Sequence, residues 1–208
     1  MLMLCFVLIS CLLLSAMSFA FTPDEAIHQL MEGNERYVKD QLLHPNRSVI
    51  RREAIVAKQE PFAIILGCAD SRVSPEIIFD QGIGDLFIVR VAGNVAGPVE
   101  LDSLQFSAEY LHSSVILVLG HENCGAVTAV LNRQTKDIEN VAALIEPAIQ
   151  QIRRSEGNIL EKAIRANVKA IVLKVKAAPL IKELIEKDKI TVIGGYYELA
   201  SGKVILID

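Results

Sequence analysis

The stretch PFAIILGCADSR, residues 61–72, holds an unbroken apolar run at 62–66, which is followed closely by Cys68, Asp70 and Arg72. An apolar run of this length between turn residues is typical of a strand buried on both faces, as the strands of parallel sheets are. The polar residues then come at the carboxyl end of the predicted strand, where open α/β sheets bind their ligands. The stretch therefore predicts a parallel sheet with a functional site at one edge.

Apolar runs of the same kind recur along the chain at 86–91 and 115–119. Helical stretches are expected between the runs, a short one after Pro75 and a longer one from about Pro98 to His112. Buried strands that alternate with helices predict an α/β fold, with a mainly parallel central sheet flanked by helices.

The part of the chain after Cys124 is expected to be mostly helical as far as Lys187 and then to return to the sheet. Residues 190–193 predict a further strand. Residues 197–200 and 204–207 predict a C-terminal hairpin around a turn at Ser201 and Gly202.

A helix start is expected at Thr22, because Pro suits the next position and Glu25 completes a capping box. The apolar residues that follow at helical spacing give this helix one apolar face, which we expect to pack on a neighbouring subunit. Residues 51–58 predict a second helix.

Residues 1–20 contain no charged side chain and end in Ser18, Phe19 and Ala20, with small residues where a signal peptidase reads. They predict a signal peptide and export to the periplasm or cell envelope, ahead of one domain at 21–208. The segment lacks a basic beginning, so two alternatives stay open. One is an uncleaved membrane anchor, since about twenty apolar residues span a bilayer, and the other is a buried first helix.

Charge and cysteine content argue against one class of function and leave two roles for the remaining cysteines. The formal net charge of −4 gives no electrostatic reason to expect nucleic-acid binding. Of the four cysteines, Cys5 and Cys11 lie in the leader, so the mature domain keeps only Cys68 and Cys124. In an oxidising compartment these two form either a disulfide or part of a metal site.

The segment His121-Glu122-Asn123-Cys124 favours the metal site. Together with Cys68 it offers two thiolates and an imidazole, which is a ligand set that zinc takes in proteins. Glu122 and Asn123 are expected to be solvent-facing turn residues. The charge pair of Asp70 and Arg72 has no use in a purely structural zinc site, and so it indicates catalysis.

These motifs resemble those of the β-class carbonic anhydrases, in which the patterns read C-x-D-x-R and H-x-x-C. Gln59 stands nine residues before Cys68, as the active-site glutamine of that family does. Ala92-Gly93-Asn94 matches the family's A-G-N turn, and Gly125 follows the last ligand as expected. The resemblance runs from about Phe21 to the end of the chain.

The resemblance implies a carbonate dehydratase with one Zn²⁺ per subunit, held by Cys68, His121 and Cys124. Hydroxide formed at the zinc would attack carbon dioxide to give bicarbonate. Asp70 would either pair with Arg72 and orient the nucleophile, or move onto the zinc as a fourth ligand in a closed form.

The resemblance also implies the substrate site and the assembly. Gln59 and Gly125 would position substrate or bicarbonate, and Phe87 would line the pocket. The family forms its sites at a subunit interface, so a homodimer or homotetramer is expected, with Gln59 reaching the metal site of a partner chain.

Two other functions stay open from the residues alone. One is a different zinc hydrolase that uses the same activated water on another substrate. The other is a non-catalytic, zinc-stabilised envelope protein, against which the pair of Asp70 and Arg72 argues.

Overall fold

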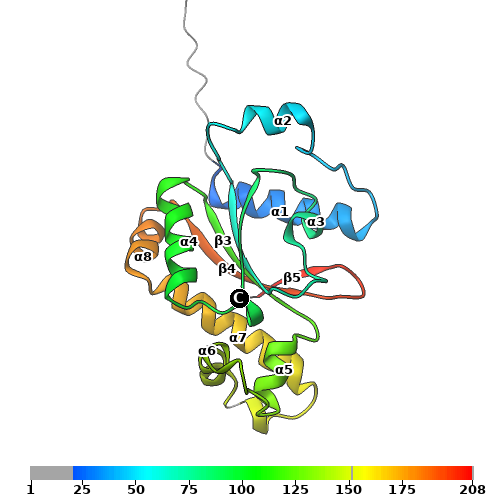
Figure 1. Cartoon of the computed structure of the whole chain (residues 1–208), viewed down its shortest axis with the longest axis vertical. Coiled ribbons are helices and arrows are strands. Elements are labelled where there is room, and N and C mark those ends of the chain that lie inside the picture. Colours follow the sequence, from blue (N-terminus) through cyan, green and yellow to red (C-terminus); the bar gives the residue numbers. More distant parts are fainter. Residues whose placement is uncertain (1–20, 151, 208) are drawn as a thin grey trace, which may run out of the picture.

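A mainly parallel sheet of five strands forms the centre of the protein in the computed structural model, which describes residues 21–150 and 152–207 (Figure 1). The strands are β1 (Ala63–Gly67), β2 (Leu86–Arg90), β3 (Val115–His121), β4 (Thr191–Tyr197) and β5 (Val204–Ile207). Their order is β2-β1-β3-β4-β5; the first four run parallel, and β5 pairs antiparallel with β4. The predicted fold class is confirmed.

Helices cover both faces of the sheet. Those of the chain's second half and α4 pack on one face, and α1 and α3 pack on the other (Figure 1). The helices are α1 (Pro23–Val38), α2 (Val49–Ala54), α3 (Pro75–Ile78), α4 (Pro98–Tyr110), α5 (Gly125–Leu131), α6 (Glu139–Ile149), α7 (Ile159–Lys176) and α8 (Pro179–Glu186), with short 3-10 turns η1 (Ala92–Asn94) and η2 (Ile152–Arg154). No helix in the described ranges is both long and apolar enough to cross a membrane.

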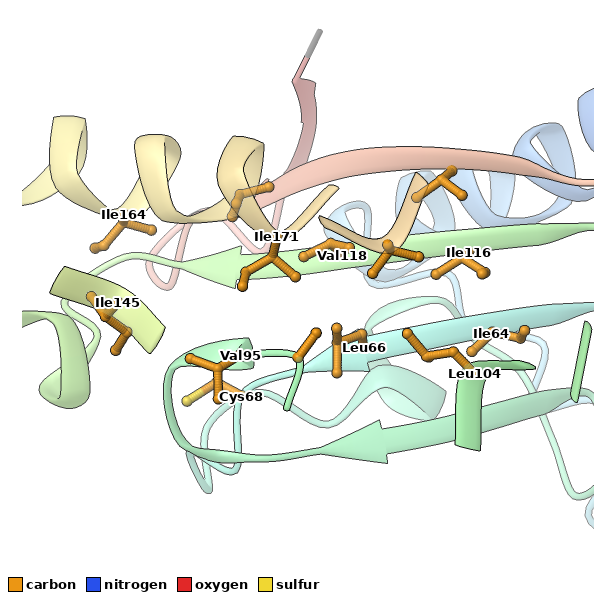
Figure 2. Close-up of a cluster of buried hydrophobic side chains, with 14 of the residues drawn as sticks. Ile64, Leu66, Cys68, Val95, Leu104, Ile116, Val118, Ile145, Ile164 and Ile171 are labelled. Atoms are coloured by element: carbon orange, nitrogen blue, oxygen red, sulfur yellow. The ribbon is translucent and has the colours of Figure 1, made fainter. Parts of the chain in front are cut away.

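The larger hydrophobic core lies between the sheet and helices α4 to α8. Successive side chains of a strand point to opposite faces, so Ile64 and Leu66 face this core while Ala63 and Ile65 face the other. Cys68 follows in the same row as Ile64 and Leu66 (Figure 2). The alternation of β1 therefore aims the Cys68 sulfur toward the face on which α4 to α8 pack.

Helix α1 begins as predicted. The Thr22 hydroxyl accepts a hydrogen bond from the Glu25 N–H at 3.3 Å, and the Glu25 carboxylate accepts one from the Thr22 N–H at 2.8 Å. Ala26 and Leu30 are buried in the smaller core beside Phe79. The expectation that the apolar face of α1 packs on a neighbouring subunit is therefore wrong, because that face covers the chain's own sheet.

The second helix differs from the predicted range of 51–58. Helix α2 spans Val49–Ala54, and the Ser48 hydroxyl caps it by accepting the Arg51 N–H at 3.1 Å. None of its residues is buried. Since α2 packs no face on the core, its sequence carries no apolar period from which its ends could be read.

The C-terminal strands also differ in extent. Strand β4 continues through Gly194 to Tyr197 and is itself the hairpin partner of β5, so the predicted separate strand at 197–200 is wrong. A Cβ atom at Gly194 would lie 2.8 Å from the Val168 side chain on α7. The glycine that interrupts the apolar run in sequence thus lets α7 approach β4 closely.

The predicted signal peptide or anchor at 1–20 lies outside the described residues.

Candidate metal centre

Three buried side chains converge where β1 and β3 end. Cys68 directly follows β1, His121 is the last residue of β3, and Cys124 is the N-cap of α5. Because β1 and β3 are neighbours in the sheet, their carboxyl ends lie together. One ligand atom from each residue lies within 4.8 Å of the other two. Both cysteines are free thiols, so the disulfide alternative is not what the fold adopts.

The His121 ring presents a free acceptor to this cluster. Its Nδ1 atom lies 2.8 Å from the backbone oxygen of Glu122, and since a carbonyl only accepts, Nδ1 carries the proton. Nε2 therefore holds the lone pair, and it is buried with no hydrogen-bond partner. A buried polar atom without a partner is costly unless another group satisfies it, and a zinc ion bound to Nε2 and two thiolates does so.

The surroundings of the two thiols shift their pKa values in opposite directions. The Cys124 side chain, hydrogen-bonded to Cys68, lowers the pKa of Cys68, and the His121 ring and the Gly93 N–H act in the same direction. The Cys68 sulfur and burial raise the pKa of Cys124. Cys68 is thus the more readily ionised of the two sulfurs, in keeping with a site that receives a cation.

Asp70 lies beside the cluster and is held by Arg72. Two atoms of the Arg72 guanidinium donate to the two carboxylate oxygens, Nε at 2.9 Å and Nη2 at 2.7 Å. This fork holds the pKa of Asp70 well below its usual range. One Asp70 oxygen is 3.8 Å from His121 Nε2, so the carboxylate reaches the edge of the cluster while paired with Arg72.

Arg90 fixes the loop that carries Cys68 and Asp70. Its Nε donates to the backbone oxygen of Cys68 at 2.9 Å, and its Nη2 donates to that of Asp70 at 2.5 Å. Arg90 belongs to none of the motifs that predicted this site. A signal for its role was available in the sequence. Arg90 is a charged residue at the carboxyl end of an apolar strand, which is the end of the sheet where the metal ligands lie.

Glu122 is also more than the solvent-facing turn residue that was predicted. Its carboxylate accepts the Leu199 N–H at 3.1 Å, and its own N–H donates to the Tyr197 oxygen at 2.8 Å. These contacts tie the residue whose carbonyl orients His121 to the C-terminal hairpin. Asn123 is exposed, as expected.

The predicted substrate residues lie in three different surroundings. Gly125 begins α5 and is exposed, and a Cβ atom added to it would meet nothing within 4 Å. Phe87 on β2 lies 6.4 Å from the Phe106 ring of α4, measured between ring centroids. Gln59 is exposed and precedes the amino end of β1, whereas Cys68 follows its carboxyl end. The chain does not bring Gln59 to its own metal cluster.

Comparisons with known proteins agree with this geometry. A sequence model described as carbonic anhydrase matches residues 63–204. Carbonic anhydrase 2 of Mycobacterium tuberculosis is 37% identical over 193 residues, which are 89% of this chain and 93% of that protein. A carbonic anhydrase of Mycolicibacterium smegmatis is 33% identical over 192 residues, covering 88% and 93% of the two chains.

Solved structures show the same fold. A β-carbonic anhydrase of Coccomyxa in complex with acetazolamide superimposes with a TM-score of 0.68 at 26% identity, covering 86% of this chain and 84% of that one. One of two tetrameric β-carbonic anhydrases from Sordaria macrospora gives a TM-score of 0.65 at 21% identity, covering 87% and 96%. The chain belongs to the carbonic anhydrase family of enzymes and has the β-carbonic anhydrase fold.

Proposed function

We propose that this protein catalyses the reversible hydration of carbon dioxide to bicarbonate and a proton, with one zinc ion per subunit at Cys68, His121 and Cys124. The observation that carries the proposal is a cluster in which one ligand atom each of Cys68, His121 and Cys124 lies within 4.8 Å of the others, while the buried Nε2 of His121 has no hydrogen-bond partner. When bound, zinc lowers the pKa of a water molecule to about 7 and so makes a nucleophile available at neutral pH.

The residues around the cluster have separate tasks in this reaction. The Asp70 carboxylate accepts a hydrogen bond from the attacking water and orients it, and Arg72 holds that carboxylate ionised. The open space at Gly125 leaves room for a bicarbonate oxygen near the start of α5. The rings of Phe87 and Phe106 lie toward the amino end of β1, since Phe87 pairs with Ile64, and there they would supply the partner chain's cluster with an apolar wall, which suits a substrate without charge or dipole.

The protein acts, in this proposal, as a homodimer or as a homotetramer built from such dimers. Two apolar surfaces on the chain support it. The segment 41–60 exposes four apolar side chains: Leu43, Val49, Ile50 and Val56. Helix α4, beside edge strand β2, exposes a second row: Val99, Phe106 and Tyr110. Exposed apolar surface of this extent marks interaction sites.

The position of Gln59 suggests why the active protein would need two subunits. It belongs to the exposed segment and lies away from its own metal cluster, so we place it at the cluster of the partner chain, where its amide would position the substrate. An interface with two-fold symmetry would complete both sites at once.

Export belongs to the proposal on sequence grounds alone, with residues 1–20 as a cleaved signal peptide and a periplasmic or envelope location. The mass of the protein recovered from the envelope tests cleavage. An intact, membrane-associated chain would establish the anchor instead.

A stopped-flow assay with carbon dioxide and a pH indicator tests the activity. Wild-type protein should hydrate carbon dioxide, lose the activity on metal removal, and regain it with one equivalent of zinc. The rate should rise between about pH 7 and pH 9, where a zinc-bound water ionises. Zinc-loaded protein that hydrolyses an ester but leaves carbon dioxide untouched would establish the different hydrolase instead. Zinc-loaded protein inert to both would indicate the non-catalytic envelope protein.

A further inference from the structure

Asn167 is a fully buried polar residue on the apolar face of α7. It lies in a helical row with Ala163, Ile171 and Val175, all of which belong to the larger core, and its own side chain is 0% exposed. Its Nδ2 donates to the backbone oxygen of Gly93 at 2.9 Å, and its Oδ1 has no partner. Burying an amide that is only half satisfied is costly. The hydrogen bond from Asn167 to Gly93 is therefore expected to have a function that offsets this cost.

Gly93 is the residue that connects this bond to the metal cluster. Its N–H donates to the Cys68 sulfur at 3.3 Å. Its φ of 70° is left-handed, and a Cβ atom there would lie 2.8 Å from the end of the Ile145 side chain, so glycine suits this position best. Glycine has unusual backbone freedom, so a hydrogen bond to its carbonyl restricts the orientation of the peptide groups on either side.

We propose that Asn167 is a positioning residue for the metal ligand Cys68, acting through Gly93. The Asn167 amide fixes the Gly93 carbonyl, and this keeps the adjoining N–H directed at the Cys68 sulfur. An N–H···S hydrogen bond stabilises the negative charge on the sulfur and sets its direction toward the metal. Groups that bond a ligand directly, as the Gly93 N–H bonds Cys68, typically contribute about 10- to 100-fold to metal affinity, and the lower end of that range is expected for Asn167, which acts through Gly93. The inference rests on the metal site of the proposed function, not on the reaction.

A matched control exists in Asn34 on α1. It is also buried and also bonds backbone groups, donating to the oxygens of Ile78 and Gly202 and accepting the N–H of Val204. These contacts join α1 to the opposite core and the hairpin, and none involves a metal ligand. Asn34→Leu thus removes a buried amide without touching the metal cluster.

The experiment compares Asn167→Leu with Asn34→Leu and wild type, using zinc affinity from chelator competition and the absorption of the cobalt-substituted proteins. Asn167→Leu should weaken zinc binding about tenfold and move the sulfur-to-cobalt charge-transfer band to longer wavelength, because the sulfur has lost its N–H. Asn34→Leu should lower thermal stability and leave both metal readouts at wild-type values.

Equal metal readouts in Asn167→Leu and wild type, or equal changes in the two variants, would overturn the inference. If Asn167→Leu does not fold, NMR of the cadmium-113-substituted wild type decides: the Gly93 amide proton should couple to the metal through the hydrogen bond and exchange slowly. An uncoupled, fast-exchanging amide would overturn the inference. Wild type that binds metal but leaves carbon dioxide unchanged would remove the proposed function and leave this test intact.

Discussion

The metal cluster and the segment 41–60 differ in how far this one chain surrounds them. Cys68, His121 and Cys124 are all buried, and their supporting contacts come from the chain itself. The segment 41–60 instead contains the most exposed apolar side chains described, with Ile50 78% and Val56 83% exposed. In Figure 1, α2 lies at the opposite end of the molecule from α5. One chain therefore assembles the whole ligand cluster but leaves an apolar surface uncovered.

The segment 41–60 is nevertheless held in shape, by carboxylates instead of by apolar packing. Asp80 accepts the N–H groups of Leu43 and His44 at 2.9 and 3.0 Å, and Arg36 Nε at 2.7 Å. Asp85 accepts two hydrogen bonds from the Asn46 amide. A preformed segment loses less conformational entropy on association than a disordered one, which favours its use as an interface.

Removing a ligand should have the largest effect. Cys68→Ser and Cys124→Ser should each weaken zinc binding by more than about 100-fold, since ligands matter more than the groups that merely support them, and should abolish activity. Metal analysis and the carbon dioxide assay measure both quantities. A Cys68→Ser protein with full zinc and normal turnover would disprove the ligand assignment.

Asp70→Asn should come next, and it separates catalysis from metal binding. Zinc content should stay at the wild-type level, because both carboxylate oxygens are bonded to Arg72 and the three ligands Cys68, His121 and Cys124 are untouched. Turnover should fall about 10²- to 10⁴-fold, the usual range for a group that handles a proton of the nucleophile. Loss of zinc in this variant would show that Asp70 is a fourth ligand.

The same comparison explains how much the sequence could predict. The apolar run at 62–66 predicts β1 because both faces of the sheet are covered. Side chains alternate along a strand, so the same run also predicts that Cys68 points to the face of Ile64 and Leu66. Thr22 and Glu25 predict the start of α1 because capping is local chemistry. The ligand cluster was predictable since its members follow strands that are neighbours in a parallel sheet.

What the sequence could not predict depends on contacts between distant segments. The ends of α2 were missed because none of its residues is buried and its contacts run to the distant residues Ile83 and Asp85. The extent of β4 was missed because Gly194 is explained only by Val168 on α7. Asn167 belongs to no motif. A single polar residue in the apolar row of α7 was the available signal, and its partner Gly93 lies far away in sequence.

A complementation experiment sharpens the comparison by asking whether Gln59 serves its own chain or a partner. Cys68→Ser chains should be inactive alone, and Gln59→Ala chains should be weakly active alone. In a mixed two-fold dimer, one site would regain both an intact metal cluster and an intact Gln59. Co-expression should then restore about a quarter of wild-type activity, because half the dimers are mixed and each has one complete site. No restoration in dimers shown to be mixed would place Gln59 in its own chain or outside the site.

The smallest expected effect concerns the base of the segment 41–60. Burial by itself would raise the pKa of Asp80, but Arg36 and the N–H groups of Leu43 and His44 together hold it below the usual value. A carboxyl whose pKa is lower in the folded state stabilises the fold above the unfolded pKa of about 4, and this contribution is lost as the pH falls through the folded pKa. Asp80→Asn should therefore cost about 2 kcal/mol at pH 7.

Below pH 4 the difference between Asp80→Asn and wild type should shrink, because protonation removes the same charge from wild type. Asp188→Asn is the matched control, since Asp188 also has a left-handed φ after a helix but is exposed. Urea unfolding of the three proteins across pH 2 to 7 measures the effect, and zinc content should not change in either variant. A constant difference between Asp80→Asn and wild type over this range would show that Asp80 acts through its shape and not its charge. The fit of the Asp80 side chain, and not its charge, would then hold the segment 41–60 in place. The segment would differ from the metal cluster only in how exposed its side chains are.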